Sequence, residues 1–173
     1  MGEAPKEGVG QPVFNEYLDS INLIERLHRQ FLEVVKGELD RLGVQDINNI
    51  QALILYNIGK DDLTVGELTN RGYYLGSNVS YNVRKMVENN YLAQERSTHD
   101  KRSVRVRASD KGLQLWARLD DMFKRHADRM GTDSVNSSEL QQANLVLQRL
   151  ERFWNSPGAY GAAPAGNVAG NAA

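Results

Sequence analysis

Apolar residues recur every three or four positions in two long segments, one near each end of the chain. The first runs from Phe14 to about Arg41, and its apolar face holds Leu18, Ile21, Leu27, Phe31 and Val34 or Val35. The second runs from about Ser137 to Trp154 and repeats Leu140, Ala143, Leu147, Leu150 and Trp154. These spacings predict two amphipathic helices. The repeat of about 3.5 residues in the second is typical of a helix packed along a partner helix.

Shorter periodic runs lie between these two helices. One helix is predicted over about 47–58, and another over about 65–70, where Thr64 and Glu67 have the spacing of a capping box. A third begins after Ser77, a good N-cap, and its apolar face holds Val79, Val83 and Met86. The other face of this helix is polar and basic. Two short helices joined by a tight turn, the second with a polar outer face, indicate a helix-turn-helix.

A pair of strands follows the helix-turn-helix. Residues 92–96 and 104–108 read as strands joined by the turn STHDKRS, and Val104 and Val106 alternate with two arginines in the second strand. A hairpin in this place forms a wing. A long helix then starts after Asp110 and keeps helical spacing at Leu113, Trp116, Leu119, Met122 and Phe123. The fold class is therefore mainly α with a small β-hairpin wing, a winged helix-turn-helix flanked by N- and C-terminal helices.

The distribution of apolar residues also divides the chain into regions. Residues 46–111 form the winged helix-turn-helix, and residues 13–45 and 112–155 form the flanking helices. Residues 1–12 and 156–173 carry too little apolar surface to order, so we expect a disordered arm and a flexible Gly/Ala-rich tail. So small a winged module cannot cover both long terminal helices, which favours a symmetric dimer in which they cover one another. An intramolecular bundle is the alternative.

Charge changes the picture because it is concentrated. The 173-residue chain has a formal net charge of −1, yet nine Lys or Arg stand against four Asp or Glu between Arg71 and Gly112. A basic segment in a chain that is otherwise acidic favours a localised binding site for a polyanion. Chance clustering of surface charge would produce the same count.

Several classes of protein are not favoured. The chain has no cysteine, which excludes disulfides and thiolate metal sites. It shows neither a signal peptide nor an apolar run long enough for a membrane helix, so we expect a cytoplasmic protein without a membrane partner. The three histidines are far apart, Asp61 and Asp62 read as a loop, and no phosphate loop or nucleophile elbow is present. We therefore do not expect an enzyme.

The wing carries a recognisable motif. Asp100-x-Arg102, five further residues and then Ala108-Ser109-x-x-Gly112 resemble the motif DxRxxxxxLTxxG of the MarR family of bacterial transcription regulators. Ala and Ser replace the usual Leu and Thr. The order of elements from Phe14 to Trp154 is also similar to that family. The stretch YYLGSNVSYNVRKM resembles a subgroup from alphaproteobacteria that includes regulators of cell-envelope genes, although Tyr81 stands where the family often has arginine.

The resemblance implies a homodimer that binds double-stranded DNA at a palindromic operator, with half-sites roughly one helical turn, or 10 bp, apart. It implies that Arg102 enters the minor groove and that Asp100 holds the tip of the wing. The implied DNA-binding residues lie on the recognition helix and the wing: Ser77, Asn78, Ser80, Tyr81, Arg84, Lys85, Asp100, Lys101, Arg102 and Arg105.

The family often responds to small aromatic ligands held between the dimerisation helices and the winged module. His28, Phe31, Tyr56 and Trp116 are on the elements that would line such a cleft. Ordinary core packing is the other interpretation of these four residues. No cofactor is expected apart from such an effector, and a zinc-sensing member of the family is a minor alternative.

Two other functions remain open at this stage. A winged helix can act as a protein-interaction scaffold without sequence-specific DNA binding, and such a scaffold would not need the cations of the wing. An architectural DNA binder would show strong salt dependence but little preference for an operator over random DNA.

Overall fold

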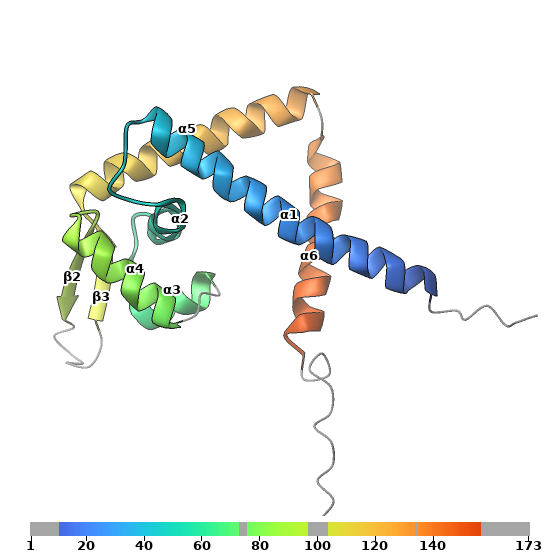
Figure 1. Ribbon diagram of the computed structural model, residues 1–173, viewed down its shortest axis with the longest axis horizontal. Helices are drawn as coiled ribbons and strands as arrows, with labels where there is room; N and C mark the ends of the chain where they lie inside the picture. Colours follow the sequence, from blue (N-terminus) through green and yellow to red (C-terminus); the bar gives the residue numbers. More distant parts are fainter. Residues whose placement is uncertain (1–10, 73–75, 97–103, 134, 157–173) are drawn as a thin grey trace, which may run out of the picture. The chain divides into compact units, whose positions relative to one another are not determined.

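The computed structural model describes residues 11–72, 76–96, 104–133 and 135–156. Figure 1 shows the order of their elements along the chain. The helices and strands are α1 (Gln11–Arg41), α2 (Asn49–Ile58), β1 (Asp62–Thr64), α3 (Val65–Gly72), α4 (Gly76–Glu88), β2 (Leu92–Arg96), β3 (Val104–Ala108), α5 (Asp110–Asp133) and α6 (Ser137–Trp154). The predicted fold class is confirmed. The chain divides after Phe123, inside α5, into two compact units.

The core of the first unit surrounds α2, which supplies the fully buried Ile54, Leu55 and Ile58. The predicted apolar face of α4 is confirmed, since Val79, Val83 and Met86 are all buried. The last turns of α1 and the first half of α5 close the core with Val35, Leu39, Leu115, Leu119 and Met122. The sequence-based division assigned these last residues to the flanking dimerisation helices, but their side chains belong to the same core as the winged module.

The sheet has three antiparallel strands in the order β1-β3-β2. The predicted hairpin of β2 and β3 is confirmed, with Leu92 opposite Ala108 and Arg96 opposite Val104. Strand β1 was missed, and the loop expected at Asp62 is wrong. Leu63 pairs with Val106 and is buried. The strand has only three residues and polar neighbours, so the sequence pattern alone does not show that it is a strand.

Helix boundaries follow local capping. The capping box predicted at α3 is confirmed, because Thr64 Oγ1 accepts from the Glu67 backbone N–H at 3.1 Å and Glu67 Oε2 accepts from the Thr64 N–H at 2.7 Å. The Glu67 carboxylate accepts hydrogen bonds from both the backbone N–H and the hydroxyl of Thr64, and these lower the pKa of Glu67. Helix α1 begins at Gln11, two residues inside the segment expected to be disordered. Helix α4 begins at Gly76, one residue before the serine expected to cap it.

The start of α5 is fixed by Ser109 and Gly112. The Ser109 hydroxyl accepts from the Gly112 N–H at 3.0 Å, and it donates to the carbonyl of Asn90 at 2.6 Å. A Cβ on residue 112 would overlap the backbone carbonyl of Tyr91 and press on Leu55. Ser109 and Gly112 therefore have structural roles. Ser109 caps the start of α5, and Gly112 lets the turn before β2 approach this helix.

The second unit consists of the end of α5 and α6. Asn136 and Glu139 form a capping box that starts α6. Within the described part of the chain no side chain of α6 is buried, although Leu140, Leu147 and Phe153 are large and apolar. None of the described helices is both long and apolar enough to cross a membrane.

Replacing Gly112 by alanine tests the close approach of the α5 start to Tyr91. We expect Gly112→Ala to lower the free energy of unfolding by about 1–3 kcal/mol or more, because backbone must move to admit the methyl group. Gly131→Ala is the matched control on the same helix, since nothing lies within 4 Å of its Cβ position. It should be neutral or stabilising by up to about 1 kcal/mol. Urea denaturation of both variants measures the difference, and equal stabilities would contradict this role of Gly112.

Candidate DNA-binding surface

Helix α4 presents its polar face to solvent because its apolar face is anchored in the core. Val79, Val83 and Met86 point inward at steps of four and three, so the opposite side of the helix faces outward. Asn78, Ser80, Tyr81 and Arg84 are exposed. The side chain of Ser77 lies outside the described residues. Four of the predicted contacts thus share one accessible face, which suits a helix that enters the major groove.

Tyr81 and Arg84 form a pair on this face. The Arg84 guanidinium carbon lies 5.8 Å from the centre of the Tyr81 ring, and the ring is 54% exposed. A cation–π contact of this kind is weak in water but restricts the arginine to one side of the helix. Arg84 also approaches Glu88 at 3.9 Å, the limit of an ion pair. The guanidinium is therefore held near the tyrosine and is still accessible to a ligand.

Lys85 is held more firmly. Its Nζ donates to Glu88 Oε2 at 2.7 Å, and this hydrogen bond raises the pKa of Lys85 and lowers the pKa of Glu88. Lys85 was expected to contact DNA together with Arg84. Its ammonium group is half-exposed and already has a carboxylate partner, so it is less available than Arg84.

Asn82 has a structural role that the sequence analysis missed. Its Oδ1 accepts from Gln51 Nε2 at 3.2 Å, and its own Nδ2 donates to the carbonyl of Asn78 at 2.8 Å. Gln51 is buried and forms a capping box with Asn48 at the start of α2. The amide of Asn82 thus ties α4 to α2 and helps to set the orientation of α4.

The cations near the wing are mostly paired. Arg105, expected to bind DNA, donates to the Asp62 carboxylate at 3.1 Å and to the Asp62 carbonyl, so it joins β3 to β1. The tip of the wing, with Asp100, Lys101 and Arg102, lies outside the described residues. The described ion pairs of the basic segment are Arg71–Asp61, Arg105–Asp62, Arg107–Glu95, Lys85–Glu88 and Lys111–Asp46.

Three of those acids, Asp46, Asp61 and Asp62, come from outside the basic segment. Counting charge along the sequence therefore overstated the positive charge of the surface, because folding brings acids from earlier in the chain to these cations. The pairs are solvent-exposed and are weakened by water and salt, so phosphates can compete for the cations.

A polar network joins the wing to the rest of the first unit. Asp46 accepts from the Tyr91 hydroxyl at 2.6 Å and from Lys111 Nζ at 2.6 Å. The hydrogen bond from Lys111 is the main reason that the pKa of Asp46 is lowered, and burial raises the pKa of Tyr91. Lys111 also lies 4.0 Å from the centre of the Tyr91 ring. The network connects the loop before α2, the turn before β2 and the first turn of α5.

Three of the four predicted effector residues come together in an aromatic cluster. The Tyr56 ring lies 5.9 Å from Trp116 and 4.7 Å from Phe123, and Phe31 lies 5.9 Å from Phe123. The Tyr56 hydroxyl donates to Asp120 at 3.1 Å. The sequence analysis placed Phe123 at helical spacing and did not foresee its place in this cluster. His28 is exposed on α1 and contributes no ring contact to the cluster in the described residues. The described residues include no group of three metal-ligating side chains.

The elements and the exposed face of α4 define a winged helix-turn-helix protein of the DNA-binding type. A family model described as the MarR family matches residues 45–103. A curated relative from Rhizobium meliloti, the exopolysaccharide II synthesis transcriptional activator ExpG, is 35% identical over 92% of this chain and 86% of its own length. The chain belongs to the MarR family of transcriptional regulators.

Solved structures show the same fold. A MarR variant from E. coli complexed with operator DNA has a TM-score of 0.66 at 18% identity, covering 79% of this chain and 96% of the other. FabT from Streptococcus pneumoniae in complex with DNA has a TM-score of 0.61 at 23% identity, covering 83% and 96%. The regulator BldR from Sulfolobus solfataricus has a TM-score of 0.64 at 23% identity, covering 79% and 97%.

Removing the Tyr91 hydroxyl tests the network at the base of the wing. We expect Tyr91→Phe to lower the free energy of unfolding by about 0.5–1.5 kcal/mol at pH 7, the net value of a hydrogen bond. Asp46 has a lowered pKa in the folded state, so its stabilising contribution is present above its unfolded value of about 4 and is lost as the pH falls through the lower folded pKa. The difference from wild type should therefore shrink toward pH 3. Urea titrations across this range measure it, and a difference independent of pH would argue against Asp46 as the partner.

Proposed function

We propose that this chain is a sequence-specific transcription regulator that acts as a homodimer on a palindromic operator and responds to a small ligand. The observation that carries the proposal is the exposed face of α4. Asn78, Ser80, Tyr81 and Arg84 project from a helix whose opposite face is locked into the core. Arginine donates two parallel hydrogen bonds to guanine in the major groove, so Arg84 is the main base reader in this proposal.

Dimerisation is supported by apolar surface that one chain leaves exposed. Helix α1 exposes Leu23, Leu27, Phe31 and Val34, and α6 exposes Leu140, Val146, Leu147 and Phe153. Several large apolar side chains exposed along one helix are typical of an interface. A second copy of the chain offers the same helices, so a two-fold symmetric contact would cover them. Two recognition helices would then meet a palindromic site.

The proposal extends to the effector and the target genes. The cluster of Phe31, Tyr56, Trp116 and Phe123 joins α1, α2 and α5, so an aromatic ligand inserted there would favour one arrangement of these helices. The relative from Rhizobium meliloti is named as an activator of exopolysaccharide II synthesis. We therefore place genes for extracellular polysaccharide among the targets.

Recovery of genomic DNA tests the operator. The purified full chain is incubated with sheared DNA from its own genome at physiological salt, and the retained fragments are sequenced. We expect a few sites with two-fold symmetry. Arg84→Ala should bind them about thirtyfold more weakly or worse, because each of the two subunits loses one base-reading pair worth about 1–3 kcal/mol. Arg102→Ala should weaken binding as well.

Lys36→Ala is the matched control, because it removes an exposed cation that lies on α1 and belongs neither to α3 nor to α4. Uniform retention of all fragments would indicate an architectural binder, and no retention would indicate a protein scaffold. Either result would overturn the proposed function. An Arg84→Ala effect no larger than that of Lys36→Ala would overturn the role of Arg84 alone.

The dimer is tested by two substitutions on α6. Leu147 lies on the apolar seam, and Leu145, two residues away, points to nearly the opposite side of the helix. Both are exposed in the single chain, at 46% and 56%. We expect Leu147→Glu to shift the protein from dimer to monomer, because a carboxylate would be buried in the interface. Leu145→Glu should leave the dimer intact. Sedimentation equilibrium measures both masses, and a monomeric wild type or a dimeric Leu147→Glu would contradict the assigned seam.

A further inference from the structure

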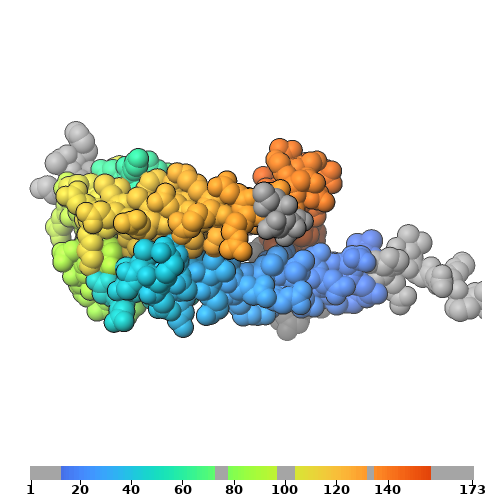
Figure 2. All heavy atoms as spheres, turned by 90° about the horizontal axis from the view of Figure 1, so that it is seen from above, coloured from blue at the N-terminus to red at the C-terminus, as the bar shows by residue number. Residues whose placement is uncertain are grey.

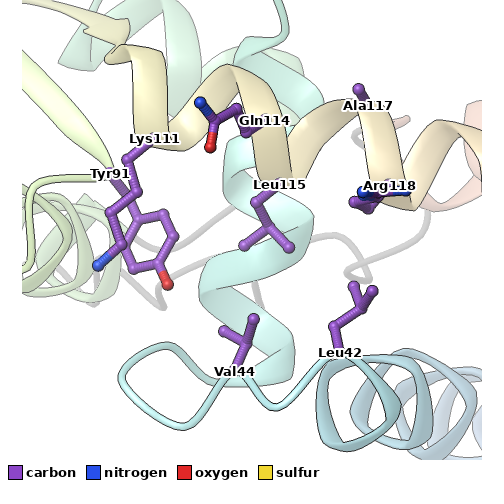
Figure 3. A pocket seen from close by; sticks show the side chains of 8 residues that line it. All are labelled: Leu42, Val44, Tyr91, Lys111, Gln114, Leu115, Ala117 and Arg118. Atoms are coloured by element: carbon purple, nitrogen blue, oxygen red, sulfur yellow. The ribbon is translucent and has the colours of Figure 1, made fainter.

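A cavity of about 530 Å³ lies between the loop after α1 and the first half of α5. Figure 3 shows Leu115 pointing from α5 toward Val44, with Tyr91 and Lys111 at one end and Arg118 near Leu42 at the other. In Figure 2 the cyan end of α1 lies next to the yellow first half of α5. The remaining lining residues are Gln114 and Ala117. A cavity of this size suits a small organic molecule.

The cavity is separate from the aromatic cluster. Lys111, Leu115 and Arg118 follow one another on α5 at steps of four and three, so they share one face of the helix. Trp116, Asp120 and Phe123 follow the same spacing on a different face, where they meet Tyr56. A ligand of the cavity would therefore not touch the cluster assigned to the aromatic effector.

The lining favours an anion with an aliphatic body. None of its eight residues is acidic, two are cations, and Leu42, Val44, Leu115 and Ala117 supply aliphatic surface. Tyr91 is the one aromatic lining residue, and the ammonium group of Lys111 covers its ring at 4.0 Å. A flat aromatic ligand would find that ring occupied, whereas an aliphatic chain needs only the apolar walls.

The two cations are not equivalent. Lys111 is already paired with Asp46 at 2.6 Å and also donates to the carbonyl of Asn89 at 3.0 Å. Arg118 is exposed and forms no ion pair or side-chain hydrogen bond within the described part of the chain. A guanidinium binds a carboxylate through two parallel hydrogen bonds. Arg118 is therefore the group that would hold the head of an anionic ligand.

We propose that this cavity is a binding site for a small aliphatic carboxylate, with the carboxylate on Arg118 and the chain between Leu42, Val44 and Leu115. The walls come from the loop before α2, the turn before β2 and α5, so a bound ligand contacts the same three segments that the Asp46 network joins. The site concerns binding to the chain alone and does not depend on the proposed action on DNA.

Titration of the full chain with octanoate tests the site. Calorimetry measures the affinity, and backbone and methyl NMR locate the ligand. We expect saturable binding with shifts at Leu42, Val44 and Leu115. Arg118→Gln should weaken it at least tenfold, the effect of losing a charge-assisted hydrogen bond, and Arg118→Lys should restore part of the affinity. Octan-1-ol, which lacks the charge, should bind at least tenfold more weakly than octanoate.

Lys60→Gln is the matched control, because Lys60 lies 5.3 Å from the Trp116 ring on the aromatic side of α5. It should leave octanoate binding unchanged. Absence of saturable binding would overturn the proposal. So would affinity that is insensitive to Arg118→Gln, or a loss in Lys60→Gln as large as in Arg118→Gln, which would locate the ligand at the aromatic cluster. Because binding is measured without DNA, failure here leaves the operator experiment unaffected.

Discussion

The first turn of α5 and the backbone before β2 meet at Gly112, and the orientation of the winged module depends on that contact. The Tyr91 carbonyl lies where any Cβ of residue 112 would be, while Ser109 caps the helix and binds the Asn90 carbonyl. Asp46, Tyr91 and Lys111 add a polar network on the same joint. Steric fit and hydrogen bonding together hold the helix that carries Leu115, Leu119 and Met122 against the module that carries α4.

The exposed polar face of α4 follows from this arrangement and from the division of the helix into a buried and an exposed side. Three buried apolar residues fix which side chains point outward, and the Asn82–Gln51 hydrogen bond ties the helix to α2. The positive charge of the region is moderated by acids from other segments. Specificity in the proposed DNA complex would therefore come from a few accessible groups such as Arg84, and the paired cations would contribute mainly if phosphates displace their carboxylate partners.

The periodic elements were predictable because their signals are local. The apolar steps of α4 and α6, the capping box at Thr64 and the alternation in β3 all correspond to the observed helices and strands. Strand β1 was not predictable, because its pairing with β3 joins residues more than forty positions apart and its own pattern is three residues long. The partners of Arg105 and Lys111 were hidden for the same reason, since Asp62 and Asp46 are remote in sequence.

The candidate sites show the same limit. The spacing of apolar residues along α4 was enough to predict which face of this helix is exposed. Three of the four residues predicted to bind an effector do gather in one cluster. The sequence marked Gly112 only as part of a motif, and its steric role needed the position of the Tyr91 carbonyl. The cavity beside Arg118 had no sequence signal, because its lining residues come from three separate segments and each is ordinary in its own context.

Hydroxyl-radical footprinting on a genomic fragment that the protein retains tests the central claim most directly. Two recognition helices related by two-fold symmetry predict two protected patches of equal strength, with centres roughly 10 bp apart and the same pattern on both strands. A single protected patch, or protection spread evenly along the fragment, would contradict symmetric and sequence-specific recognition through α4.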